Sequence, residues 1–205
     1  ARPVIAMRPK PKAILFDRDG VLVDSYLVWF HLLNAVAARF GYPAISDETY
    51  RVGWGQSTSA DREAFFPGHS VEQIEAAYDE HYHEQLEHLR VPDSVPEVFA
   101  RLDRAGLGSA VCTNTQGSLA RATVARTGAT PQVIVGGDEV PEGKPAPDML
   151  VRACELLGVS TEEVWMIGDS RYDREAARAA GVHFVGRGID GDQRIEELRE
   201  LTDLL

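Results

Sequence analysis

Two aspartates, Asp17 and Asp19, follow the apolar run AILF of residues 13–16 and are followed by a glycine in the segment FDRDGVLVDS. Side chains of a strand alternate between its faces, so both carboxylates would point the same way if the strand continued. Two unit charges about 4 Å apart repel by roughly 4 kcal/mol at an effective dielectric constant near 20. We therefore expect a proton, a cation or a ligand to neutralise this pair.

Three further polar segments lie beside the ends of predicted elements. Thr113 and Asn114 follow the run SAVC, Lys144 precedes a helical pattern in GKPAPD, and Asp169 ends an apolar run and leads to Asp173 in GDSRYD. In an open α/β sheet, ligands bind outside the carboxyl ends of the strands, where the strand order reverses. We therefore expect all four segments to form one site.

The charges of such a site can balance around a phosphate. Asp17, Asp19 and Asp169 supply the hard oxygen ligands that suit Mg²⁺, which usually keeps waters and a substrate phosphate oxygen in its shell. Lys144 adds a fixed positive charge, and the Thr-Asn pair offers a hydroxyl, an amide and backbone N–H groups to phosphate oxygens. A dianionic phosphate can then enter a site that would otherwise repel it.

The elements that must position these residues follow from the apolar pattern. Five short apolar segments predict buried strands over residues 13–17, 109–113, 132–136, 163–169 and 183–186, with helical patterns near 116–128, 145–157, 171–181 and 193–204. Apolar strands that alternate with helices predict an α/β fold with a doubly wound parallel sheet covered on both faces.

The interval between the first two strands is far longer than a crossover requires, and its pattern is helical. SYLVWFHLLNAVAARFGY predicts a helix ending at Gly41, and the segment 71–89 predicts another, with Ser70 and Gln73 as its capping box. We predict a helical subdomain over residues 24–90, inserted into a core domain of residues 1–23 and 91–205. A helix over 93–106 would return the chain to the core.

Together, the order and spacing of FDRDGVLVDS, TN, GKPAPD and GDSRYD resemble the four motifs of the haloacid dehalogenase superfamily. The helical insertion resembles the cap of its phosphoglycolate phosphatase and β-phosphoglucomutase branch. The resemblance implies that Asp17 is the nucleophile that forms an aspartyl-phosphate, and Asp19 the general acid and then base. It also implies that Thr113 binds the phosphoryl group, Lys144 holds phosphate and nucleophile, and Asp169 holds Mg²⁺.

The remaining motif residues have supporting roles in this interpretation. Asn114, Gly20 and Arg18 are expected near the phosphate, while Asp173 and Ser170 support the metal site or Lys144. Asp173 has an alternative reading as a helix cap. Asp19 can act as an acid near neutral pH only if its neighbours raise its pKa. We therefore expect its side chain to face the substrate and its backbone carbonyl to face the metal, which the family also implies.

Some features of the sequence remain open. Arg18 stands where the capped branch has an apolar residue; DRDG is more typical of the family's capless histidinol- and heptose-phosphate phosphatases, whose cysteine-rich zinc loop is missing here. We expect Arg18 to reach the substrate or the cap and to favour an extra anionic group. The loop 51–62, including Arg51, Gln56 and Ser57, either selects the substrate or merely joins helices.

Several aromatic and histidine side chains have simpler readings. His81, His83 and His88 are expected on a solvated helix face rather than at a metal, because 81 and 83 point in different directions on a helix. Trp29, Phe30 and Tyr42 are expected in the core of the cap.

The whole chain limits the classes of function. Its 205 residues carry a formal net charge of −11, which argues against a nucleic-acid partner. No apolar run is long enough for a membrane helix. The basic, proline-rich start predicts a loose leader over residues 1–12, with Met7 a possible natural start and residues 1–6 of uncertain origin. Cys112 and Cys154 have no metal-type spacing and predict buried free thiols, and a cytoplasmic location fits best.

The sequence thus predicts a Mg²⁺-dependent phosphatase of a small phosphorylated metabolite, either a monomer or a homodimer. Its substrate is open between 2-phosphoglycolate, a sugar phosphate, pyrophosphate and a biosynthetic intermediate. The first alternative is a β-phosphoglucomutase-like phosphomutase, and the second is a non-catalytic phosphate-responsive switch. A dehalogenase is disfavoured because halide displacement does not require the acid/base that Asp19 would supply.

Overall fold

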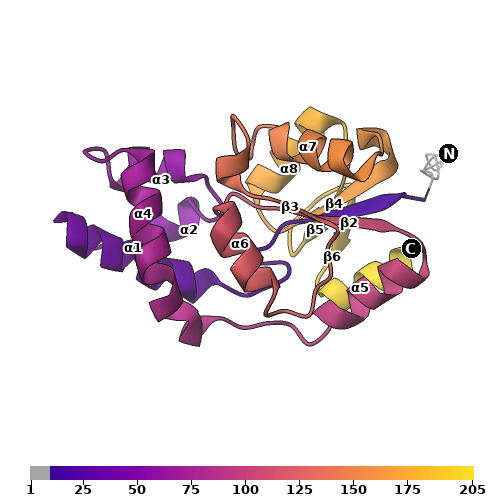
Figure 1. Cartoon of the computed structure of the whole chain (residues 1–205), viewed down its shortest axis with the longest axis horizontal. Coiled ribbons are helices and arrows are strands. Elements are labelled where there is room, and N and C mark those ends of the chain that lie inside the picture. The colour runs from indigo at the N-terminus through magenta and orange to yellow at the C-terminus, as the bar shows by residue number, and fades with distance from the viewer. Residues whose placement is uncertain (1–9) are drawn as a thin grey trace.

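The structure is a computed structural model that describes residues 10–205. Most of the predicted leader, including Met7, lies outside the described residues. Within them, the chain forms an α/β core with a helical cap at one end (Figure 1).

The core is built on a six-stranded sheet in which every neighbouring pair is parallel. The strand order is β3-β2-β1-β4-β5-β6. The chain runs outward from β1 through β2 to β3, then returns to the other side of β1 with β4. The strand order therefore reverses between β1 and β4, the place where an open α/β sheet binds its ligands. The strands are β1 Ala13–Phe16, β2 Gly108–Cys112, β3 Val133–Val135, β4 Val164–Gly168, β5 His183–Arg187 and β6 Gln193–Ile195.

The two faces of β1 show why its sequence is apolar throughout. Ile14 and Phe16 belong to one hydrophobic cluster, whereas Ala13 and Leu15 belong to another on the opposite face. The first cluster is covered by α5 and α9, and the second by α7 and α8. The core helices are α5 Val95–Arg104, α6 Gly117–Val124, α7 Asp148–Leu157, α8 Arg171–Ala180 and α9 Leu201–Leu204, with 3₁₀ turns η2 Gly137–Glu139, η3 Thr161–Glu163 and η4 Leu198–Glu200.

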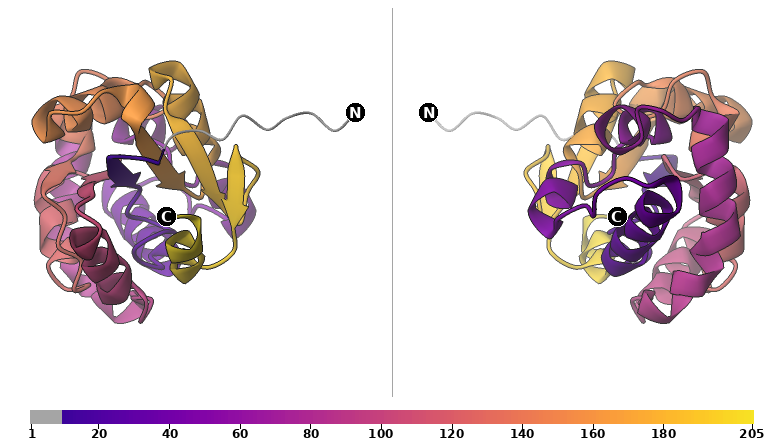
Figure 2. Two further views of the ribbon diagram at one scale, coloured as in Figure 1. Left: turned by 90° about the vertical axis from the view of Figure 1, so that its right-hand side faces the viewer. Right: turned by 90° about the vertical axis from the view of Figure 1, so that its left-hand side faces the viewer.

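The segment between β1 and α5 is helical, as predicted, and buries a third hydrophobic cluster of its own. The views along the long axis show these helices at the end of the molecule opposite the C-terminus (Figure 2). The first helix ends as predicted at Gly41, whose φ of 78° is left-handed. The capping box of Ser70 and Gln73 is also present. The elements are α1 Tyr26–Phe40, α2 Asp47–Val52, α3 Thr58–Phe65, α4 Val71–His81 and the 3₁₀ helix η1 Tyr82–His88.

Two predictions of secondary structure were wrong in part. A helix was expected over 193–204, but its first three residues form the strand β6. Ile195 is buried against the edge of the sheet and pairs with Arg187 of β5. Only a 3₁₀ turn and one short helix follow. The helix predicted over 71–89 is α-helical to His81 and continues as the 3₁₀ helix η1.

Both cysteines are buried and free, as predicted. Among residues 10–205, no helix is long and apolar enough to cross a membrane.

Candidate active site

The nucleophile candidate Asp17 extends β1 by one residue and lies at the strand-order reversal. Its backbone N–H donates to the Ile167 carbonyl of β4 at 2.8 Å, so the strand still fixes its position. The Lys144 ammonium donates to Asp17 Oδ1 at 2.8 Å and to Asp173 Oδ1 at 2.5 Å. Burial lowers the pKa of Lys144, but the charges of the two aspartates outweigh it and raise the pKa. Lys144 is therefore a buried, permanently charged partner of the nucleophile.

Asp169 follows β4 and faces Asp17 across the reversal. Its Oδ2 accepts a hydrogen bond from Trp54 Nε1 at 3.0 Å, whereas its buried Oδ1 has no hydrogen-bond partner among the described residues. Burial, and then the charge of Asp173, raises the pKa of Asp169 to about 7. The same two causes, in the same order, raise the pKa of Asp17 well above its usual value. This corner of the site carries more negative charge than its surroundings neutralise.

The acids of this corner fit a hard divalent cation. Asp17, Asp169 and Asp173 each offer an oxygen, and these oxygens lie within 4.8 Å of one another. Asp173 already accepts from Lys144 and, through Oδ2, from the Ser170 hydroxyl and backbone N–H at 2.6 and 3.1 Å. The unpartnered Oδ1 of Asp169 and the carboxylate of Asp17 are therefore the better ligands, and carboxylate oxygens suit Mg²⁺.

Asp173 and Ser170 also fix the start of α8. The Ser170 hydroxyl accepts from the Asp173 backbone N–H, which completes a capping box with Asp173. Both readings of Asp173 thus hold at once: it caps the helix and orients Lys144.

Gly20 allows the first motif to approach Asp169. Its φ is +73°, and a Cβ at this position would lie 1.8 Å from Asp169 Oδ2. Its backbone N–H donates to the Val23 carbonyl at 2.8 Å. This N–H is therefore not free to bind a phosphate, although Gly20 was expected near the phosphate. The role visible for Gly20 is to make room for Asp169.

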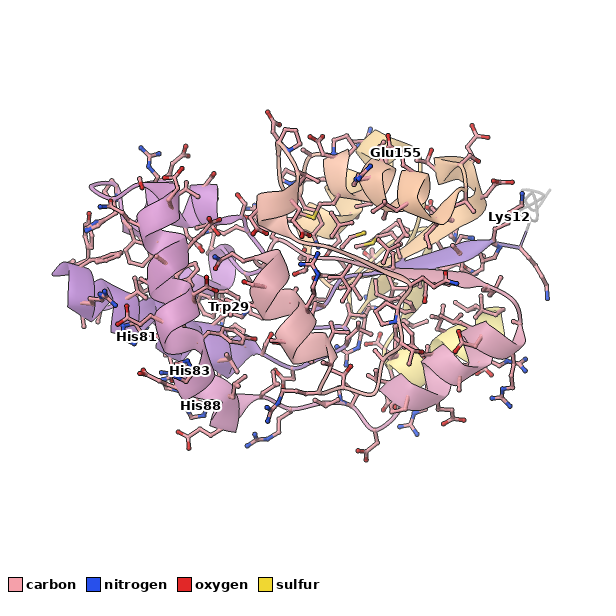
Figure 3. All side chains as sticks on the ribbon, in the orientation of Figure 1. Lys12, Trp29, His81, His83, His88 and Glu155 are labelled. Carbon is pink, nitrogen blue, oxygen red and sulfur yellow. The ribbon has the colours of Figure 1, made fainter. Side chains whose placement is uncertain are left out.

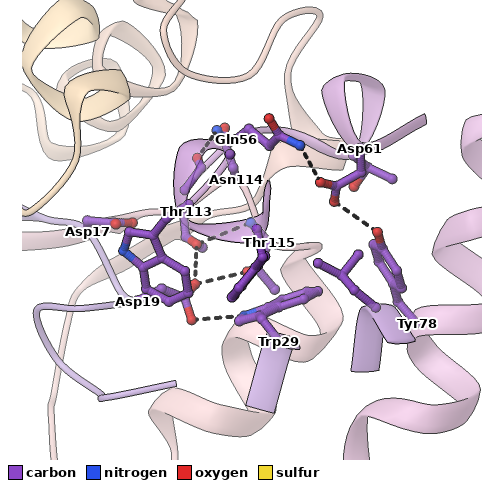
Figure 4. Close-up of a pocket in the computed structure, with 15 residues that line it drawn as sticks. Asp17, Asp19, Trp29, Gln56, Asp61, Tyr78, Thr113, Asn114 and Thr115 are labelled. Carbon is purple, nitrogen blue, oxygen red and sulfur yellow. Dashed lines mark hydrogen bonds between the residues drawn. The ribbon is translucent and has the colours of Figure 1, made fainter. Parts of the chain in front are cut away.

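Asp19 is held by five donors at the entrance to the cap. Ser25 Oγ and Trp29 Nε1 donate to its Oδ1 at 2.5 and 3.1 Å, and the Thr115 hydroxyl donates to Oδ2 at 3.1 Å. Arg18 donates to both oxygens at 2.7 and 3.1 Å. The Thr113 hydroxyl lies 3.4 Å from Oδ2. Figure 4 shows Asp19 with its partners Trp29, Thr113 and Thr115.

The pKa of Asp19 is lowered, although a raised pKa was needed for Asp19 to act as an acid near neutral pH. Burial raises it, but the charge of Arg18 and the hydrogen bonds of Arg18, Ser25 and Trp29 together outweigh burial, so the pKa is lowered. In this arrangement Asp19 is an ionised acceptor. Its carboxylate does line the pocket, together with Asp17.

Arg18 reaches the cap, one of the two alternatives expected for it, and does not line the pocket. Its side chain is fully buried behind Asp19 and donates to Thr115 and Thr123, and its guanidinium lies 5.7 Å from the centre of the Tyr82 ring in η1. No surface remains for an anionic group of a substrate. The geometry therefore favours the contact of Arg18 with the cap over a contact with substrate.

The Thr-Asn pair after β2 lies beside the acids. Thr113 and Asn114 both line the pocket. The Asn114 amide binds both backbone groups of Lys144, at 2.8 and 2.9 Å, and donates to the Gly55 carbonyl of the cap loop at 2.9 Å. Asn114 thus positions Lys144 and links core to cap.

The cap supplies further pocket residues, and among them the sequence analysis had named Gln56 of the loop 51–62. Trp54, Asp61 and Tyr78 were missed. Figure 4 shows Asp61 between Gln56 and Tyr78, joined to both by hydrogen bonds. Trp29, expected in the cap core, also lines the pocket and binds Asp19. The cavity has a volume of about 50 Å³. Only the polar, glycine-rich character of the loop 51–62 signalled these contacts.

Other candidates from the sequence lie away from the pocket. Arg51 forms an exposed ion pair with Asp47 at 2.7 Å, and Ser57 caps α3. His81, His83 and His88 lie along α4 and η1 (Figure 3), and the only described cluster of three possible metal-binding side chains is the acidic one above.

Residues 14–187 match the family model described as haloacid dehalogenase-like hydrolase. The chain belongs to this family. The chain is 33% identical to the N-acetylmuramic acid 6-phosphate phosphatase of Pseudomonas aeruginosa, over 85% of this chain and 80% of that protein. It is also 31% identical to the phosphoglycolate phosphatase of Chromobacterium violaceum, over 95% of this chain and 96% of that protein.

Two solved structures share the fold. A hydrolase of subfamily IA from Geobacter sulfurreducens is 27% identical, with a TM-score of 0.74 and coverage of 95% of this chain and 100% of that one. CbbY from Rhodobacter sphaeroides, solved in complex with phosphate, is 25% identical, with a TM-score of 0.76 and coverage of 93% and 96%. The chain is accordingly a phosphoric monoester hydrolase of the haloacid dehalogenase-like family.

Proposed function

We propose that this hydrolase is a Mg²⁺-dependent phosphatase that cleaves a small phosphorylated metabolite through an aspartyl-phosphate on Asp17. One observation carries the proposal. A buried carboxylate at the strand-order reversal is paired with a buried lysine and faces a second carboxylate whose buried Oδ1 has no partner among the described residues. Such a cluster is costly unless a cation and an anionic substrate share it.

The first step transfers the phosphoryl group to the protein. An oxygen of Asp17 attacks phosphorus, and the bond between phosphorus and the leaving alcohol oxygen breaks. Lys144 binds Oδ1 of Asp17, and no described residue donates to Oδ2, which leaves that oxygen for attack. A carboxylate nucleophile divides one slow displacement into two easier steps.

The second step returns the nucleophile. Asp19 takes a proton from a water molecule, the water oxygen attacks phosphorus, and the bond to Asp17 breaks to release inorganic phosphate. Asp19 is ionised in the structure, which is the form this step requires. In the first step it must instead give a proton to the leaving oxygen, so its contact with Arg18 must loosen when substrate binds.

Mg²⁺ would be held by Asp17 and Asp169, with the Asp19 backbone carbonyl as a further ligand, and would neutralise charge on the transferring phosphoryl group. No described residue donates a hydrogen bond to that carbonyl oxygen. Lys144 would contribute the second fixed positive charge. From the end of β2, the Thr113 hydroxyl and the Asn114 backbone N–H would bind the phosphoryl oxygens, because the Asn114 amide already binds Lys144 and Gly55.

The cap would exclude water during the first step. Trp54 and Gly55 of the cap loop bind Asp169 and Asn114 of the core, so the loop lies directly on the site. Closure of this kind protects a reactive intermediate, and opening would admit the hydrolytic water. We propose that residues 24–90 form this cap as a separate domain.

Release of phosphate from p-nitrophenyl phosphate, with Mg²⁺ and with a chelator, tests the proposal. We expect turnover only with the metal, and its loss in Asp17→Asn. Asp103→Asn is the matched control because Asp103 is exposed on α5 and does not line the pocket. Turnover that resists chelation, or full activity of Asp17→Asn, would contradict the proposal. Transfer of label from glucose 1-phosphate without phosphate release would indicate the mutase instead.

A further inference from the structure

The part of the pocket beyond the phosphate site is formed by the cap and is aromatic on several sides. Its walls are the rings of Trp29, Tyr50, Trp54 and Tyr78. Aromatic faces of this kind bind the C–H surfaces of small organic groups and exclude water. The leaving alcohol of a substrate must therefore lie against an apolar wall.

The polar groups of this space are neutral or negative. Gln56, Thr58 and Asp61 supply them, and no lysine, arginine or histidine is found among the described residues that line the pocket. Lys144 and Arg18 do not change this, because both are buried under the acids and paired with aspartates. A carboxylate on the leaving group would have no counter-ion here.

Asp61 is the key polar group because its carboxylate has acceptor capacity left. Gln56 Nε2 donates to its Oδ1 at 2.8 Å, and the Tyr78 hydroxyl donates to its Oδ2 at 2.8 Å. Figure 4 shows these two bonds at the cap side of the pocket. An ionised carboxylate offers about four acceptor sites, of which these bonds use two. The remaining sites can accept hydrogen bonds from a ligand.

No cationic side chain within the described residues pairs with Asp61. Only 8% of the residue is exposed. Burial raises the pKa of its carboxyl to about 7, and the hydrogen bonds of Gln56 and Tyr78 lower it only partly. A buried acid without a counter-charge costs stability, and such groups are concentrated at functional sites. Asp61 is not used by the proposed phosphoryl transfer.

We propose that Asp61 selects a leaving alcohol that carries hydroxyl donors and rejects one that carries a carboxylate, which deepens, and rests on, the phosphatase function above. The substrate class is then the phosphate monoester of a small polyol. Hydroxyl groups would donate to Asp61 while the carbon skeleton lies against the aromatic walls. A substrate carboxylate would meet Asp61 and Asp19 in one small cavity, and like charges brought together in this way repel one another.

This selectivity predicts a substrate different from that of a relative named as a phosphoglycolate phosphatase. Phosphoglycolate carries a carboxylate next to its phosphate ester, so this chain should discriminate against it. The relative named phosphoglycolate phosphatase is 31% identical, a distance at which pocket residues are free to differ.

A matched pair of esters tests the inference. Glycerol 3-phosphate and 3-phosphoglycerate share their phosphate and central hydroxyl, and differ in whether the third carbon is a hydroxymethyl or a carboxylate. At about pH 8, above the pKa of about 7 of Asp61, we expect the wild-type enzyme with Mg²⁺ to favour glycerol 3-phosphate by about tenfold or more in kcat/KM. In Asp61→Asn the ratio should fall severalfold towards one. Glu63→Gln, which removes an exposed acid from the same helix, should keep the wild-type ratio.

The wild-type ratio decides the inference even if Asp61→Asn does not fold. A preference for 3-phosphoglycerate, or equal use of both esters, would overturn it while leaving the phosphatase function intact. An Asp61→Asn enzyme that slows both esters equally would also overturn it, because Asp61 would then be structural. Turnover of neither ester nor of p-nitrophenyl phosphate would overturn the phosphatase function and this inference with it.

Discussion

Burial is the main cause that raises the pKa of two carboxyls, Asp61 and Asp169, to about 7, and the charge of Asp173 adds to the shift of Asp169 alone. Asp169 lies among other acids that a cation would neutralise. Asp61 lies among neutral groups, so its shift comes from burial without a counter-charge. Both acids should therefore respond to pH, whereas only Asp169 should respond to metal and only Asp61 to the leaving group.

The pH dependence of stability reports on Asp61. Its pKa in the folded protein is about 7, against a usual value of 3.8, so the folded chain keeps a proton that the unfolded chain loses as pH rises between these values. Wild-type stability should fall by up to about 1.4 kcal/mol per pH unit from this group across that window, and level off above it. Asp61→Asn lacks this contribution.

Thermal unfolding at several values between about pH 5 and 8 measures this effect. The Tm of Asp61→Asn should rise relative to wild type as the pH rises, whereas Glu63→Gln should follow wild type. Parallel curves for wild type and Asp61→Asn would show that Asp61 is not buried in the way the structure describes.

Arg18 acts on Asp19 and not on the substrate, and kinetics can separate these roles. Arg18→Lys keeps a charge but loses the two-point contact with Asp19, so kcat should fall by about tenfold. KM should stay within about twofold, because the guanidinium does not line the pocket. A raised KM with an unchanged kcat would mean that Arg18 binds the substrate after all.

At the scale of elements, the turn after β1 depends on one glycine. Gly20→Ala places a Cβ 1.8 Å from Asp169 Oδ2 and also strains a left-handed backbone. We expect Mg²⁺-dependent activity to fall by about a hundredfold, because Asp169 must move. Gly41→Ala is the control: its φ is +78°, but a Cβ there meets nothing within 4 Å. That variant should lose only about 1–2 kcal/mol of stability and keep its activity. Equal effects of both substitutions would contradict the proposed role of Gly20.

The elements were predictable where the pattern was strong and local. Both faces of β1 are apolar, with Ile14 on one and Leu15 on the other, and the capping box of Ser70 and Gln73 is a local signal. The strand β6 was missed because its three residues, QRI, include only one buried side chain. The sequence therefore indicated which strand ends carry the motifs, but not that β6 forms an edge of the sheet.

The site was predictable in the same uneven way. The motif acids follow their strands, so their convergence at the strand-order reversal could be inferred. The partners of Arg18 could not, because Thr115, Thr123 and Tyr82 are distant in the sequence and only tertiary packing brings them together. Asp61 was missed for a similar reason: in the sequence it resembles any polar residue in the first turn of a helix.

At the scale of the whole molecule, metal binding should stabilise the fold. Mg²⁺ would relieve repulsion between Asp17 and Asp169, so the Tm should rise with Mg²⁺ concentration. The gain reaches about 2.7 kcal/mol when the metal is at about 100 times its Kd. In Asp169→Asn the Tm should respond much less to Mg²⁺, whereas Asp103→Asn should respond as wild type does. If Mg²⁺ raised the Tm of Asp169→Asn as much as that of wild type, Asp169 would not be a ligand of the metal.

The identity of the phosphorylated residue tests the central claim most directly. The enzyme is mixed with p-nitrophenyl phosphate and Mg²⁺, quenched in acid during turnover, and its peptides are mapped by mass spectrometry. We expect a phosphoryl group on Asp17, and none on any peptide of Asp17→Asn. Steady release of phosphate with no modified Asp17, or a phosphoryl group on another residue, would contradict the account.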